Sequence, residues 1–394
     1  MIEDWVSLLL RWAHIVAGIG WIGSSFYFMW LDSSLKRAEG MPAGVKGENW
    51  SVHGGGFYHI QKYAVAPERM PADLHWFKWE SYSTWLTGFA LLAVVYYWGA
   101  ESYMIDRSVA DITQAQAILI SLVSLAAGWL VYDRLCKSAL ADRPVLVFAL
   151  LFAFICFAAW AWGQVFSARA AFLHVGAMTG TIMTGNVFLV IIPNQRIVVA
   201  DLKAGRTPDA KYGRIAKLRS THNNYLTLPV LFMMISNHYP MTFGHEWNVV
   251  IVAVVLLLGV VIRHWFNLHE AGAHGPKIWW QWPVAGALTA FMMAFSAWKP
   301  NAVEVADPVF TPEALAIATV HCASCHADVP SDDSFDDAPA GVMLHTASLL
   351  KSHASRVLAQ AVLTNAMPMG NDTGMTEEER ARLGAWIRAG MPDE

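Results

Sequence analysis

The stretch PVLVFALLFAFICFAAWAWG, residues 144–163, places 20 residues in a row without one charged side chain. A helix needs about 20 mostly apolar residues to cross a bilayer, so this stretch predicts a transmembrane helix. Working outward from it, we find about eight such stretches. They run over residues 5–31, 80–99, 115–133, 144–165, 169–192, 223–240, 247–268 and 278–299. We therefore expect an all-α, polytopic membrane bundle.

The composition divides the chain into an apolar part and an acidic part. Of the 394 residues, 55% are hydrophobic and only 15% are charged, whereas a soluble domain carries about 25% charge. Residues 1–300 hold 22 Lys and Arg against 17 Asp and Glu, but residues 301–394 hold 5 against 14. The sequence thus predicts an integral membrane catalytic domain over residues 1–300, a linker over 301–311 and a second domain over 312–394.

The positive charge between the predicted spans is concentrated in every second loop, which places it on one side of the membrane. Loops 32–79, 134–143, 193–222 and 269–277 together hold 17 Lys and Arg, whereas the alternate loops hold 2. Positively charged loops stay in the cytoplasm. Both termini and the C-terminal domain are therefore expected on the opposite, external side.

The strongest motif is Cys322-Ala323-Ser324-Cys325-His326, because C-x-x-C-H is the attachment site of a c-type haem. The thiols of Cys322 and Cys325 would bind the haem covalently, and His326 would be the first axial ligand. Met367, which precedes a proline, resembles the second axial ligand of small monohaem cytochromes c. We expect residues 312–394 to form a small all-α cytochrome c domain with one haem. Iron held by His and Met has no open site, so the domain should carry electrons.

Two of the histidines inside predicted spans occupy matching positions. Aligning His14 in the first span with His174 in the fifth also pairs several neighbouring residues, and the second and sixth spans continue the match. The bundle could therefore consist of two four-helix parallel repeats. Ionisable groups inside a membrane are candidates for function. This pair could bind substrate, relay a proton or ligate an additional haem b, or it could join helices by hydrogen bonds.

Polar residues also gather where the second and sixth spans are expected to begin, on the cytoplasmic side. The candidate catalytic residues there are Glu80, Tyr82, His222, Asn223 and Tyr225. They could form a polar pocket, with loop 32–79 as its lid, or they could cap helix ends. In a pocket, Glu80 or a histidine would be the candidate base.

Four strings are distinctive: His53-Gly54-Gly55-Gly56-Phe57-Tyr58, residues 74–80, residues 219–225, and Ser236-Asn237-His238-Tyr239-Pro240. With the C-terminal C-x-x-C-H motif, they resemble the bacterial membrane-bound urate oxidases (urate hydroxylases) that are fused to a cytochrome c. This resemblance implies oxidation of urate to 5-hydroxyisourate in purine breakdown, with electrons passed one at a time to the haem and not to O2. It also implies a multi-pass protein of the bacterial inner membrane, with the cytochrome domain in the periplasm.

The partners expected from this resemblance are urate, the lipid bilayer and an external electron acceptor such as another cytochrome or a terminal oxidase. No nucleic-acid partner is expected. Three alternatives stay open at this point: an oxidoreductase for a quinol or another small metabolite, a tethered electron carrier without chemistry of its own, and a transporter gated by redox state.

Overall fold

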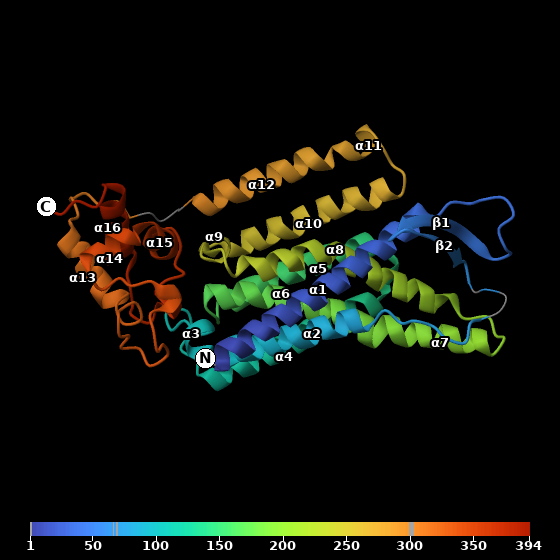
Figure 1. Ribbon diagram of the computed structural model, residues 1–394, viewed down its shortest axis with the longest axis horizontal. Helices are drawn as coiled ribbons and strands as arrows, with labels where there is room; N and C mark the ends of the chain where they lie inside the picture. Colours follow the sequence, from blue (N-terminus) through green and yellow to red (C-terminus); the bar gives the residue numbers. More distant parts are fainter. Residues whose placement is uncertain (1, 66, 68–69, 299–302) are drawn as a thin grey trace.

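The computed structural model describes residues 2–65, 67, 70–298 and 303–394. Long helices lie side by side in a bundle, and a smaller helical unit formed by the C-terminal residues meets one end of it (Figure 1). We call that end the junction end and the opposite end, which carries two strands, the hairpin end. The predicted domain boundary at residues 300–301 lies outside the described residues.

All eight predicted apolar stretches are largely helical. The long helical segments of the bundle are α1 (Ile2–Ser34), α2 with η1 (Trp79–Leu91, Leu92–Tyr97), α4 (Gln114–Lys137), α5 (Pro144–Gly163), α6 with η3 and α7 (Ala168–Gly185, Asn186–Ile191, Ile192–Lys203), α8 (Ala210–Ser236), α10 (Asn248–Glu270) and α12 (Gln281–Ala297). Short connections are α3 (Ala100–Tyr103), η2 (Ala139–Asp142), α9 (Pro240–Phe243) and α11 (Pro276–Trp279).

Five of these helical segments are long and apolar enough to cross a membrane. They are Asp4–Ser34, Gln114–Lys137, Pro144–Gly163, Ala168–Lys203 and Asn248–Glu270. The structure therefore confirms a mostly helical protein with several helices suited to a bilayer. The full count of eight spans stays a prediction.

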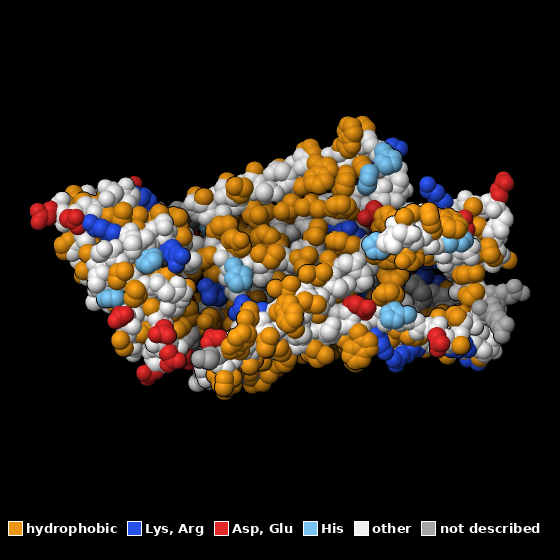
Figure 2. All heavy atoms as spheres, viewed as in Figure 1, with side chains coloured by type: hydrophobic (Ala, Val, Ile, Leu, Met, Phe, Trp, Pro, Cys, Tyr) orange, Lys and Arg blue, Asp and Glu red, His pale blue; other side chains and the backbone are white. Residues whose placement is uncertain are grey.

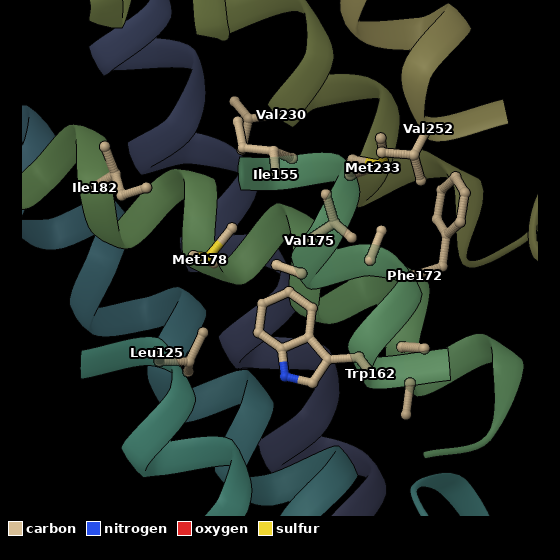
Figure 3. Close-up of a cluster of buried hydrophobic side chains, with 14 of the residues drawn as sticks. Leu125, Ile155, Trp162, Phe172, Val175, Met178, Ile182, Val230, Met233 and Val252 are labelled. Atoms are coloured by element: carbon tan, nitrogen blue, oxygen red, sulfur yellow. The ribbon is translucent and has the colours of Figure 1, made fainter. Parts of the chain in front are cut away.

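Helix α5 shows why these residues fold as they do. Pro144 occupies the first turn, where its missing N–H is not needed. Val147, Leu151 and Ile155 recur every four residues, so they share one face and are buried there. They join the core around Trp162 and Met178 (Figure 3). The opposite face stays apolar and exposed, and hydrophobic side chains cover much of the visible flank of the bundle (Figure 2).

The expectation of an all-α fold needs one correction. Residues 32–79 contain an antiparallel hairpin of β1 (Val45–His53) and β2 (Gly56–Tyr63). The turn is Gly54-Gly55, with φ of +58° and +80°, which suits a two-residue hairpin turn. Long apolar stretches do not mark short polar strands. The prediction that residues 53–58 lie in a loop was therefore wrong.

The predicted loop 193–222 was also wrong in extent. Helix α7 and the first half of α8 fill most of it. Lys and Arg are good helix formers, so a helix can continue beyond its apolar portion, and hydropathy marks only that portion. Consequently His222, Asn223 and Tyr225 lie in the middle of α8 and not near its start.

The C-terminal unit has its own core. Its helices are α13 (Thr311–His321), η4 (Pro339–Gly341), α14 (Ala347–Ser352), α15 (Ala354–Val357), η5 (Leu358–Val362), η6 (Met369–Asn371) and α16 (Glu377–Arg388). The first and last helices pack together, and buried Trp386 donates to the Thr311 hydroxyl over 3.2 Å. Thr376 and Glu379 form the expected capping box at the start of α16.

Candidate functional site

A cavity of about 430 Å³ lies between α1, α2 with η1, α6 and α8, in the half of the bundle nearer the junction end. These helices are the two pairs that the repeat hypothesis relates. Most of the lining is apolar, and the polar or aromatic exceptions include Arg11, His14, Trp21, Thr84, Trp85, Tyr96, Thr181, Asn237 and His238. A mostly apolar cavity of this size with a few polar groups is typical of a small-molecule site.

His14 is held in a defined orientation in this cavity. Its Nδ1 lies 3.0 Å from the Thr84 carbonyl oxygen and 3.0 Å from the Thr87 hydroxyl. Because a carbonyl only accepts, Nδ1 carries the hydrogen and Nε2 is left able to accept a proton. Gly88 makes room for the ring, since a methyl group there would lie 2.8 Å from His14 Cε1.

Tyr96 connects the cavity to the junction end. Its side chain is 3% exposed, and its hydroxyl donates to Asn237 Oδ1 over 2.9 Å. Its ring centroid lies 5.8 Å from that of Tyr103 in α3. The main chain directly after Tyr103 contacts the C-terminal unit, as described below.

His174 has a different environment from His14. It is fully buried, with Nε2 2.6 Å from the Ser121 hydroxyl and Nδ1 2.7 Å from the Ala170 carbonyl oxygen. It does not line the cavity. Both ring nitrogens of His174 are engaged, so the geometry does not suit ligation of a haem b between His14 and His174.

A second group of polar side chains fills the bundle toward the hairpin end. We call it the Asp133–Arg219 network; its members are Tyr132, Asp133, Asn186, Arg219, His222 and Asn223. Arg219 and Asp133 form an ion pair of 2.7 Å, and their side chains are 1% and 5% exposed. Asn186 links Arg219, Tyr132 and Asn223 over 2.9 to 3.1 Å. The Tyr132 hydroxyl lies 2.9 Å from His222 Nδ1.

The predicted catalytic residues therefore separate into several places. His222 and Asn223 belong to the Asp133–Arg219 network, while the Tyr225 hydroxyl pairs with His264 Nδ1 over 2.9 Å. Glu80 keeps one buried carboxylate oxygen without a partner, and Tyr82 packs its ring against Phe188. No hydrogen bond among the described residues joins Glu80 or Tyr82 to the network. Loop 32–79 does not line the cavity around His14.

Several residues that the sequence analysis missed are prominent in the structure. Arg11 lines the cavity, Asp133 pairs with Arg219, and Arg263 is a buried cation in α10. For Arg11 and Arg263 the signal was present, since each is a charged residue inside a predicted span. Asp133 ends another predicted span, where it looked like an ordinary boundary residue.

The residues predicted to hold a c-type haem lie in the C-terminal unit. Cys322 and Cys325 are free thiols. A C-x-x-C spacing can also form a reactive redox dithiol, but burial raises the pKa of Cys322 to about 11, which disfavours that chemistry. His326 Nδ1 lies 2.8 Å from the Val342 carbonyl oxygen, which fixes the ring and leaves Nε2 for iron. Met367 packs against the same core as Cys322. This set of side chains suits the group.

The segment with Met367 is held from within its own unit. Arg380 is 3% exposed, and its guanidinium donates to the carbonyl oxygens of both Met367 and Ala361. Two buried backbone acceptors are thereby satisfied by one cation. The position of this segment is therefore set by contacts within the C-terminal unit and not only by the bundle.

The same segment makes the contact with the bundle. A methyl group at Gly370 would lie 2.6 Å from the Ile105 carbonyl oxygen, and one at Gly244 would lie 2.6 Å from Thr364 Cβ. Ala366 packs against the core of the bundle. A second cavity of about 290 Å³ lies at this junction, lined by residues of both parts, among them Tyr103, Arg169, Phe243 and Met369.

The structure is that of a helical protein with membrane-compatible helices, a mostly apolar cavity lined by a few polar groups, and a docked C-terminal unit. The family described as urate oxidase N-terminal matches residues 1–297, so the chain belongs to that family. This confirms a urate oxidase-related protein over residues 1–297. The membrane-bound form and the fusion to a cytochrome c stay predictions, since the match stops before the C-terminal unit. No curated protein and no solved structure matches the chain.

Proposed function

We propose that this protein oxidises urate to 5-hydroxyisourate in the cavity around His14 and passes the electrons to a c-type haem in its C-terminal unit. The family of residues 1–297 supports the substrate. The observation that carries the coupling is the junction, where the segment around Met367 lies against the same end of the bundle that Tyr96 approaches. A membrane location is supported by the five apolar helices.

The chemistry needs an anion site, a base and an electron acceptor. Urate monoanion loses two electrons and one proton, and one water then adds to the oxidised ring to give 5-hydroxyisourate. Arg11 would attract the anion, and Trp21 or Trp85 would stack on its planar ring. His14 Nε2 would accept the proton, because the hydrogen bonds of Nδ1 hold it in the required tautomer.

The bound haem would supply a one-electron acceptor, so each turnover needs two transfers. Cys322 and Cys325 would attach it, and His326 and Met367 would hold its iron. Tyr96, Tyr103 and the main chain at Ile105 make a packed series of contacts from the cavity to Gly370. Placing the substrate at His14 avoids the bilayer-wide separation that a pocket among Glu80, Tyr82 and Tyr225 would create.

The proposed orientation has the junction end outside the cytoplasm. The basic loops meet at the hairpin end, opposite the C-terminal unit (Figure 1), which is the arrangement that the charge rule favours. An external acceptor would then reach the C-terminal unit directly.

The test uses membranes that contain the full chain with attached haem, kept without oxygen. Urate should reduce the haem, and replacing Cys322 and Cys325 with Ala should abolish the spectral change. Reduction by a quinol but not by urate would overturn the proposal in favour of a quinol-oxidising protein.

A further inference from the structure

The two buried arginines of the bundle toward the hairpin end differ in their charge partners. Arg219 has Asp133 at 2.7 Å. Arg263 is 2% exposed, yet no carboxylate of the residues that the structure describes lies within salt-bridge distance of it. A buried cation without a close counter-charge is costly, since buried charges are normally paired.

The surroundings of Arg263 position its guanidinium on two sides. Its Nε donates to Asn224 Oδ1 over 2.5 Å, and Asn224 in turn donates to Asn267 over 3.1 Å. The guanidinium carbon lies 4.1 Å from the centroid of the Phe26 ring. One edge and one face are thus occupied, and the outer nitrogen Nη2 is buried with no hydrogen-bond partner.

An acceptor without a partner accompanies this unused donor. Glu270 interacts electrostatically with Arg263 from beyond salt-bridge distance, and its Oε2 is also buried without a partner. Native proteins pair the great majority of buried polar atoms. Arg263 and Glu270 are seven residues, about two turns, apart on α10. Such a donor and acceptor would both be satisfied by a ligand that presents an anionic or carbonyl oxygen together with an N–H group.

We infer that Arg263, with Asn224, Phe26 and Glu270, binds a small planar anion with lactam-type edges, at a second site separate from the cavity around His14. Arg263 Nη2 would donate to an oxygen of the ligand, and Glu270 would accept from its N–H. Identifying that ligand with urate rests on the proposed function.

The second site has a defined place relative to the cavity. Ile22 lines the His14 cavity, and Phe26 follows one helical turn later on α1. The second site therefore lies on the hairpin side of the cavity.

The experiment measures how many urate molecules bind to the full chain with haem attached, after dithionite has reduced the haem and blocked turnover. Equilibrium dialysis with radiolabelled urate should give two per wild-type chain. R263M should bind one, because a neutral side chain of similar length removes the donor. R143M removes the same charge from an exposed position and should still bind two.

Equal binding by R263M and wild type would overturn the inference. If the wild-type chain binds one urate and R263M binds none, the result supports the inference. It would also show that the cavity around His14 is not the substrate site. If the wild-type chain binds no urate, the proposed function fails while the anion site stays open to test. Bromide is then used as the probe for that site. Anomalous density for bromide beside Arg263 Nη2 would then support the anion site, and its absence would overturn it.

Discussion

The two halves of the bundle use polar residues in different ways. Toward the junction end, His14 and Arg11 border a cavity, and His14 has one nitrogen free. Toward the hairpin end, Asp133, Arg219 and Asn186 bond mainly to one another. A polar group with unused bonding capacity beside empty space can act on a ligand, whereas a connected network mainly fixes helices in place. Density of polar residues in a sequence does not distinguish the two.

The sharpest way to test this difference is to remove His14. H14A should lower the rate of urate oxidation by about 10² to 10⁴-fold, the usual contribution of a general base, while the melting temperature changes little. The measurement is the initial rate of haem reduction by urate. H174A is the matched control: it should lower the melting temperature instead, because His174 is fully buried and hydrogen-bonded at both nitrogens. Loss of rate in H174A at unchanged stability would reverse the assignment.

Substitutions in the Asp133–Arg219 network should change mainly the free energy of unfolding. D133N leaves the buried Arg219 without its counter-charge and should cost about 3–5 kcal/mol, measured by denaturation of the purified protein. Replacing both partners with Leu should recover much of that loss, since a neutral apolar pair carries no desolvation cost. Abolished oxidation in D133N with unchanged stability would show that the network is the chemical site.

A substitution at Gly370 can disturb the contact between the C-terminal unit and the bundle while leaving the cavity around His14 unchanged. G370A would place a methyl group 2.6 Å from the Ile105 carbonyl oxygen, and we expect at least about tenfold slower reduction of the haem by urate, or about 1.4 kcal/mol. Gly374 is the control, because its φ of +68° is also positive but nothing lies within 4 Å. G374A should share the backbone strain and keep the rate. Equal slowing in both variants would point to strain and not to docking.

The smallest effect concerns acid stability of the C-terminal unit. Hydrogen bonds from Thr376, and then from His321, lower the pKa of Glu379 from 4.5 to about 2. A lowered pKa in the folded state means that this contribution is complete above about pH 4.5 and is lost as pH falls toward about 2. E379Q should flatten that part of the stability profile measured by circular dichroism. An unchanged slope would show that Glu379 contributes nothing there.

Local patterns in the sequence were enough for the elements whose cause is local. The uncharged run at residues 144–163 is a helix because its own composition and length decide it. The Thr376–Glu379 box and the C-x-x-C-H spacing act over a few residues. The hairpin was missed although its signal is also local, because Gly54-Gly55 stands between short strands that no apolar stretch marks.

The family resemblance of residues 1–297 was also available from the sequence, in strings such as 53–58 and 219–225. The density of polar residues at the predicted starts of the second and sixth spans led the candidate site toward the hairpin end. His222 pairs with Tyr132, 90 positions away in the chain, and Asn223 accepts from Asn186, 37 positions away. Partners so distant in sequence are set by helix packing, which one sequence does not reveal.

Hydropathy, charge and short motifs are properties of the chain, so most of the helices, the division into an apolar and an acidic part, and the residues suited to a c-type haem could be predicted from the sequence. The packing of the helices was needed to show that His14 lines a cavity while His174 does not, and that Gly370 lies against Ile105. It also shows that Arg219 has a carboxylate at 2.7 Å, whereas no described carboxylate lies within salt-bridge distance of Arg263. Each of these depends on which side chain another helix brings within a few ångströms. Burial and pairing, which set the chemistry of an ionisable group, arise only at that level.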